Sequence, residues 1–169
     1  EFISNSINEV IGSYSSFVDI FSGTGVVGNY FNNTNTKVIS NDLLYSNYIT
    51  NYAFLSHESF NYNKIDCCIN EFNNIKGKEN YFSKHFGDKF FSKDTAKKIG
   101  TIRENIEKLY KKNEINFRER AILITSLIYA SDKIANTCGH YDAYRENIDL
   151  KDDIFLKHLD IFHDKNSNN

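Results

Sequence analysis

The sequence predicts an α/β fold that starts from one strand–helix–strand unit. An apolar run at residues 17–21 leads into three closely spaced glycines, Gly23, Gly25 and Gly28, and a second short apolar run follows at 37–40. Glycines at the end of a strand let the backbone approach a ligand closely, and the helix that follows them offers unpaired N–H groups. Two strands joined in this way pair in parallel and form the smallest module that holds a phosphate or a nucleoside.

The other elements follow from the spacing of apolar residues along the chain. From the N-terminus we expect an amphipathic helix at 2–11 that ends near Gly12, a strand at 17–21, a helix at 25–31, a strand at 37–40 and a helix at 43–55. Residues 58–94 show no clear periodicity, and we interpret them as an insertion. Further along, the pattern predicts a helix at 95–111 capped by Asp94, a buried helix at 117–135 and an extended segment at 154–162.

Composition limits the class of protein. With 169 residues, 40% of them hydrophobic, the chain is long enough for one domain with a sizeable core. It has no run of about 18 apolar residues and no basic N-terminal segment followed by an apolar stretch. We therefore expect no membrane partner and no secretory signal, and we place the protein in the cytoplasm. Cys67, Cys68 and Cys138 lack a Cys-x-x-Cys pair, which predicts reduced thiols and no metal site.

Charge is distributed unevenly along the chain. The formal net charge is −2, but residues 84–120 hold eleven basic and six acidic side chains, a local excess of +5. Aromatic residues lie among these basic side chains, mostly at 81–91. A surface that follows a phosphate backbone has this composition, and so has a solvated helix face above a few core aromatics. Both interpretations stay open.

Two acids near the glycines indicate which ligand the glycine turn serves. Asp19 lies in the expected strand, four residues before Gly23. A carboxylate there attracts the ammonium and sulfonium groups of S-adenosylmethionine (AdoMet) and repels the pyrophosphate of a dinucleotide; alternatively, it orders the turn by accepting N–H hydrogen bonds. Asp42 follows the second strand, where an acid accepts the hydroxyl protons of a cofactor ribose. It is equally suited to cap the next helix.

Residues 17–28 resemble the first motif of AdoMet-dependent methyltransferases, in the version found in Dam-like adenine-specific DNA methyltransferases. Three further segments are similar to parts of that family: Ser40-Asn41-Asp42 with Tyr45-Ser46 and Asn51, then Tyr81-Phe82-Ser83 with residues 97–103, and residues 131–144, which look like a stretch of bacterial restriction-modification methylases. The resemblance implies a partial Rossmann-like AdoMet-dependent methyltransferase fold with a mostly helical insertion. It also implies that the enzyme binds double-stranded DNA and methylates the exocyclic amino nitrogen of adenine.

The resemblance assigns roles to particular residues and regions. AdoMet contacts are expected from seven residues: Asp19, Phe21, Ser22, Gly23, Thr24, Gly25 and Asp42. Phosphate contacts are expected from Lys97, Lys98, Arg103 and Lys133. By region, we expect the AdoMet-binding part at 1–57, a helical target-recognition insertion at 58–140, and a return segment toward the catalytic part at 141–169.

One motif of the family is absent from these residues. Its catalytic signature, Asp/Asn-Pro-Pro-Tyr/Phe, requires proline, and the chain has none. We therefore assign no catalytic residue, and we expect a central fragment of a larger enzyme rather than a naturally truncated relative. Two alternatives stay open, a non-catalytic AdoMet- or DNA-binding relative and an NAD-binding oxidoreductase domain. The recognition sequence and the oligomeric state are not predicted.

Overall fold

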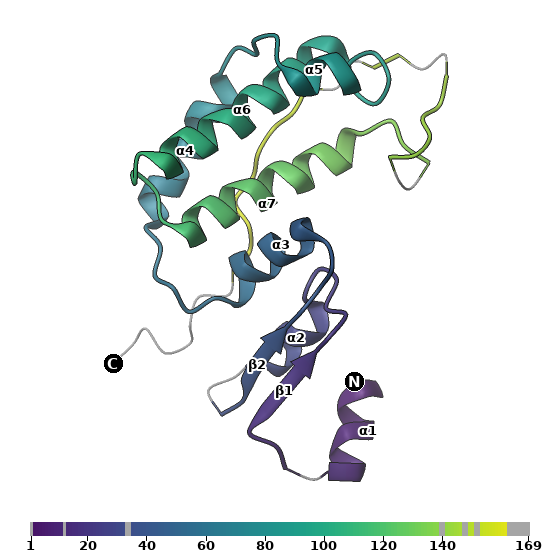
Figure 1. Cartoon of the computed structure of the whole chain (residues 1–169), viewed down its shortest axis with the longest axis vertical. Helices are drawn as coiled ribbons and strands as arrows, with labels where there is room; N and C mark the ends of the chain where they lie inside the picture. The colour runs from purple at the N-terminus through teal and green to yellow at the C-terminus, as the bar shows by residue number, and fades with distance from the viewer. Residues whose placement is uncertain are drawn as a thin grey trace. The chain divides into compact units, whose positions relative to one another are not determined.

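The structure is a computed structural model that describes residues 2–11, 13–32, 35–138, 141–146, 149–150 and 153–161. The chain divides into two compact units, Glu1–His57 and Glu58–Asn169 (Figure 1). The first unit combines helices with a small parallel sheet, and the named elements of the second are all helices. Within the described ranges, no helix is both long enough and apolar enough to cross a membrane.

The first unit contains the expected strand–helix–strand module. Its elements are α1 (Phe2–Ile11), β1 (Ser16–Asp19), α2 (Val26–Phe31), β2 (Lys37–Ser40) and α3 (Tyr45–Leu55). The two strands pair in parallel, with Ser16 opposite Lys37 and Asp19 opposite Ser40. β1 ends two residues earlier than predicted and α3 begins two residues later, whereas β2 has the predicted bounds.

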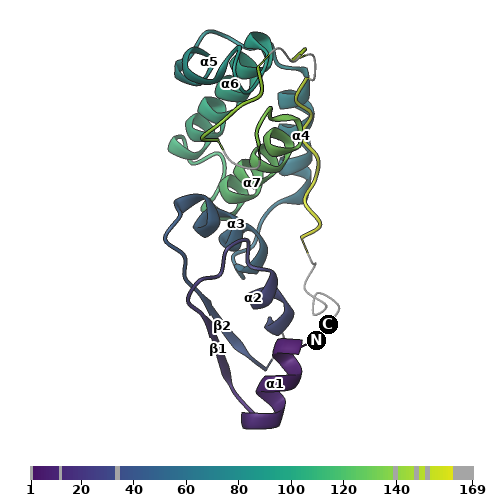
Figure 2. The ribbon, with the colours of Figure 1, turned by 90° about the vertical axis from the view of Figure 1, so that its right-hand side faces the viewer.

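The sheet packs against α2 on one face (Figure 2). Phe31 of α2 is buried and stacks on Phe17 of β1, with 4.1 Å between the ring centroids. Side chains alternate along both strands, so that Val18 and Ile39, on the opposite face, remain 53% and 43% exposed. Because the strands are parallel, their carboxyl ends lie together, and the loops that follow both strands meet at one edge of the sheet.

The second unit is helical. It contains α4 (Tyr62–Asn74), α5 (Tyr81–Phe86), α6 (Lys93–Lys111) and α7 (Phe117–Ile134). A set of buried apolar side chains from α4, α6, α7 and residues 153–161 makes its core: Ile65, Ile69, Phe72, Ile99, Ile102, Ile106, Ile122, Leu123, Leu127, Ile154 and Leu156. The expected extended segment at 154–162 is described as far as residue 161 and forms no strand there.

That segment is held by side chains of two helices. Asn73 of α4 accepts a hydrogen bond from the Leu156 N–H at 2.7 Å and donates to the Leu156 carbonyl at 3.0 Å. The Ser126 hydroxyl of α7 donates to the Lys157 carbonyl at 2.6 Å. Side-chain amides and hydroxyls thus satisfy backbone groups that a neighbouring strand would otherwise bind.

Residues 58–94, in which the sequence shows no clear periodicity, contain two helices, α4 and α5, within the region expected to be a helical insertion. Both helices begin at an asparagine cap: the Asn61 side chain accepts from the Lys64 N–H, and the Asn80 side chain accepts from the Ser83 N–H. Asparagine competes poorly in helix interiors but is strongly favoured at this position. The cap of α6 is also corrected, because Ser92 and not Asp94 accepts the Thr95 N–H.

Candidate functional site

The glycine turn links β1 to α2 and contains two left-handed residues. Gly23 has φ +51° and Gly25 has φ +84°, a region that costs an L-residue about 1–2 kcal/mol. The Gly25 N–H donates to the Ser22 carbonyl at 2.8 Å, which closes the turn. The Ser22 N–H in turn donates to the Asn41 carbonyl at 3.0 Å. The turn is therefore joined to the loop that follows β2.

Asp42 holds this turn from the loop after β2. Its Oδ2 accepts the Gly23 N–H at 2.9 Å, and its Oδ1 accepts the Leu44 N–H at 2.9 Å and the Asn47 Nδ2 at 3.0 Å. Hydrogen bonds from Leu44, then Asn47, then Gly23 lower the pKa of the Asp42 carboxyl below its usual value. The N-cap of α3 is Leu44, so Asp42 precedes the cap and does not act as one.

Asp19 is the last residue of β1. Its backbone carbonyl accepts the Asn41 N–H at 2.8 Å. Its carboxylate forms no hydrogen bond or ion pair with any residue in the described part of the chain. The alternative in which Asp19 orders the turn is therefore not what the structure shows, because Asp42 accepts the Gly23 N–H. Among the described residues, nothing neutralises the negative charge of Asp19.

The other predicted cofactor residues occupy different positions in the turn. Ser22 is buried, and its hydroxyl donates to the Asn41 carbonyl at 3.2 Å, so it holds the turn. Phe21 is 87% exposed and Thr24 is also exposed. A Cβ added at Gly23 would meet no atom within 4 Å, so the space beside this backbone is open.

Two asparagines of α3 complete the site, and the sequence did not assign them a role. The Asn51 Nδ2 donates to the Gly23 carbonyl and to the Asn47 carbonyl, both at 2.8 Å. A Cβ added at Gly25 would overlap the Asn51 Oδ1. The signal in the sequence is the spacing, because two asparagines four residues apart lie on one face of a helix that follows the second strand.

The four basic residues predicted to contact phosphate differ in burial and in ion pairing. Lys98 is only 8% exposed and forms an ion pair with Asp153 at 2.9 Å. Arg103 pairs with Glu107 one turn along α6. Lys133, on α7, is exposed and has no ion pair with a described residue. Of these three, only Lys133 has no acidic partner in the described part of the chain.

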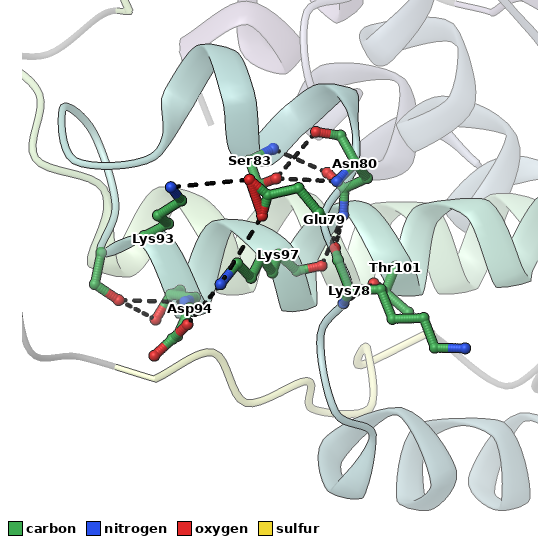
Figure 3. A network of polar contacts seen from close by, with 10 residues as sticks. Lys78, Glu79, Asn80, Ser83, Lys93, Asp94, Lys97 and Thr101 are labelled. Atoms are coloured by element: carbon green, nitrogen blue, oxygen red, sulfur yellow. Dashed lines mark hydrogen bonds and ion pairs between the residues drawn. The ribbon is translucent and has the colours of Figure 1, made fainter.

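Lys97, the fourth, lies in a polar network between α5 and α6 (Figure 3). Its Nζ lies 3.2 Å from Asp94 and 3.9 Å from Glu79. In the same network, the Asn80 Nδ2 donates to the Lys97 carbonyl at 2.9 Å, and a Cβ at Gly100 would overlap the Asn80 side chain. The segments around residues 80–83 and 97–101 therefore contact each other, and their side chains stabilise the packing of α5 on α6.

The comparison with protein families supplies what the geometry alone does not. The sequence pattern of the D12 class N6 adenine-specific DNA methyltransferases matches residues 1–169. The chain belongs to this family. No solved structure gives a significant match.

Curated relatives of the chain are restriction-modification methylases. It is 28% identical over 138 residues to the type II methyltransferase M.NlaIII of Neisseria lactamica. The aligned region covers 78% of this chain and 41% of that protein. It is 30% identical over 181 residues to the modification methylase StsI of Streptococcus sanguinis. This alignment covers 93% of this chain and 26% of that protein. The chain thus spans less than half of the length of these relatives.

Proposed function

We propose that this chain forms the AdoMet site of a DNA adenine methyltransferase. The whole protein would move the methyl group of AdoMet to the exocyclic amino nitrogen of adenine in double-stranded DNA. The observation that carries the proposal is the pair of acids at the carboxyl ends of β1 and β2 in a member of this family. One acid, Asp42, holds the glycine turn, and the other, Asp19, has no described partner.

The residues present fit AdoMet in charge and in shape. The Asp19 carboxylate has no partner within the described ranges and suits the ammonium and sulfonium cations, since a nearby opposite charge stabilises both. The open space beside Gly23 admits a ligand next to the backbone. When bound, AdoMet supplies the electrophilic methyl group, while the chain orients the cofactor. We assign contacts to six residues, Asp19, Phe21, Gly23, Thr24, Gly25 and Asp42. Ser22 and Asp42 also support the turn.

Asp42 has little remaining capacity for hydrogen bonds. An ionised carboxylate offers about four lone-pair positions, and N–H groups of Gly23, Leu44 and Asn47 already use three of them. We propose that Asp42 accepts one ribose hydroxyl, and not two as the sequence suggested. The second hydroxyl then requires another acceptor.

The sheet in this chain is consistent with part of a Rossmann-like methyltransferase fold. Parallel sheets are normally covered on both faces, but Val18 and Ile39 are exposed on the face away from α2. We propose that 1–57 holds the cofactor, 58–140 contacts the target DNA and 141–169 leads back toward the catalytic part. An Asp/Asn-Pro-Pro-Tyr/Phe motif would lie in another part of the protein, because these 169 residues contain no proline.

Among the proposed DNA contacts, the structure favours Lys133. Lys97, Lys98 and Arg103 each form an ion pair within the chain. To bind a phosphate, each of them would have to leave an acidic partner, whereas Lys133 has no such partner among the described residues. Release of condensed counterions by such a lysine favours binding to DNA of any sequence.

The proposal is tested by calorimetric titration of the full-length protein with AdoMet, S-adenosylhomocysteine and NAD. We expect binding of the first two and none of NAD. A second assay measures N6-methyladenine in DNA after incubation with labelled AdoMet. Binding of NAD without AdoMet would contradict the proposed cofactor, and AdoMet binding without any methylated adenine would contradict the proposed reaction.

A further inference from the structure

Asn51 is a buried polar residue that contacts the candidate site without reaching the surface. It is 6% exposed and lies on α3, 28 residues beyond Gly23. We propose that Asn51 is a positioning residue for the cofactor site, and that it acts with Asp42 as one unit. This inference rests on the proposed function, because it concerns the same AdoMet site.

The two residues bind the two backbone groups of Gly23, one on each side of its Cα. Asp42 accepts the Gly23 N–H at 2.9 Å, and Asn51 donates to the Gly23 carbonyl at 2.8 Å. Gly23 is left-handed and has open space on its Cβ side, so packing on that side does not fix it. Hydrogen bonds to its N–H and its carbonyl therefore set the path of the backbone that AdoMet would approach.

A third residue, Asn47, joins Asp42 to Asn51. The Asn47 Nδ2 donates to the Asp42 Oδ1 at 3.0 Å, and the Asn47 carbonyl accepts from the Asn51 Nδ2 at 2.8 Å. The hydrogen bonds form a closed ring that runs from Asp42 to Gly23, Asn51, Asn47 and back to Asp42. Members of one hydrogen-bonded network couple energetically, so loss of either side of the ring changes what the other side contributes.

The same ring explains why Gly25 tolerates no side chain. The Asn51 Oδ1 lies where a Cβ of residue 25 would be, so the amide fills the inside of the turn. Its Nδ2 is directed at two carbonyl oxygens, which fixes the orientation of the amide. The orientation follows from this pattern, because only the nitrogen of the amide donates.

The test replaces the amide by a carboxylate of nearly the same shape. Asn51→Asp removes both donated hydrogen bonds and places an anionic oxygen against two carbonyls. Asn74→Asp is the matched control, since Asn74 of α4 donates in the same way to the carbonyl four residues earlier, at 2.8 Å, and is exposed. AdoMet affinity of the full-length protein is measured by calorimetry, and amide exchange of residues 20–27 by mass spectrometry.

We expect Asn51→Asp to weaken AdoMet binding by about tenfold or more and to accelerate exchange in the turn, and Asn74→Asp to change affinity by less than about twofold. In the double variant with Asp42→Asn, the loss of affinity should be smaller than the product of the two single losses. If Asn51 and Asp42 acted independently, the loss of affinity in the double variant would equal that product. Unchanged affinity and exchange in folded Asn51→Asp protein would overturn the inference, and so would independent effects.

Two further outcomes have defined meanings. If the wild-type protein does not bind AdoMet, the proposed function fails, and turn exchange in Asn51→Asp still decides whether Asn51 anchors Gly23. If Asn51→Asp does not fold, Asn47→Ala is used, since it removes only the Nδ2 donor and keeps the carbonyl that Asn51 binds. A normal turn and normal affinity in that variant would contradict the ring.

Discussion

The two left-handed glycines of the turn have different surroundings, and this difference predicts different costs for the same substitution. Alanine at Gly23 adds a methyl group to open space, so only the left-handed backbone costs free energy, about 1–2 kcal/mol. Alanine at Gly25 carries that cost and also displaces Asn51. The displaced amide loses two hydrogen bonds, each contributing about 0.5–1.5 kcal/mol. We expect Gly25→Ala to cost about 2–5 kcal/mol in total.

Urea unfolding followed by circular dichroism measures these costs. The order of the unfolding midpoints should be wild type, then Gly23→Ala, then Gly25→Ala. AdoMet affinity should fall in both variants, because Gly23→Ala fills the space that the ligand approaches. Equal destabilisation by the two substitutions would refute the reasoning, since it would show that contact with Asn51 does not decide the cost.

Four other predictions follow from the site and from the second unit. Asp19→Asn should leave the unfolding midpoint unchanged, because no described bond is lost, and weaken AdoMet binding by about 1.5–3 kcal/mol in a calorimetric titration; normal affinity would exclude a role in holding the cation. Either the 2′-deoxy or the 3′-deoxy analogue of S-adenosylhomocysteine, but not both, should lose the hydrogen bond to Asp42, as competition binding would show. Burial alone would raise the pKa of Glu119, but hydrogen bonds from Asn61, Asn116 and Lys64 outweigh it and lower the pKa from its ordinary 4.5. The stability that these bonds add is therefore complete above pH 4.5 and is lost as the pH falls through the lowered pKa, so Glu119→Gln should flatten the acid limb of a stability–pH curve. Lys133→Glu should weaken DNA binding and reduce the salt slope by about one, whereas Lys98→Ala should mainly lower stability, and equal salt slopes in the two would contradict this distinction.

Local patterns predicted the elements that depend on neighbouring residues. The glycine turn, β2 and the long helices α6 and α7 lie where the spacing placed them, to within two residues. α4 and α5 were missed, although Ile65, Cys68, Ile69 and Phe72 repeat at helical spacing and are buried. Two asparagines of that region, Asn61 and Asn80, are the N-caps of these helices.

Charge predicted less about the second unit than spacing did. Part of the positive charge at 84–120 is used inside the chain. Arg120 is buried, bonds to Glu107 and lies over the Tyr110 ring, and Arg118 is buried and donates to the Glu58 carbonyl. A run of basic residues sets the total charge of a segment, but burial and ion pairing decide how much of that charge is accessible to a partner.

By itself, the sequence determined that two short strands and a glycine turn form a strand–helix–strand module, with Asp19 and Asp42 beside the turn. Apolar spacing and glycine are local properties, so they are readable along the chain. Only the tertiary structure decided that Asp42 holds the turn, that Asp19 has no partner among the described residues and that Asn51 of α3 donates a hydrogen bond to Gly23. These bonds join residues 19 and 28 positions apart. Their partners are chosen by the packing of α3 beside the turn, a contact between distant residues that no local pattern specifies.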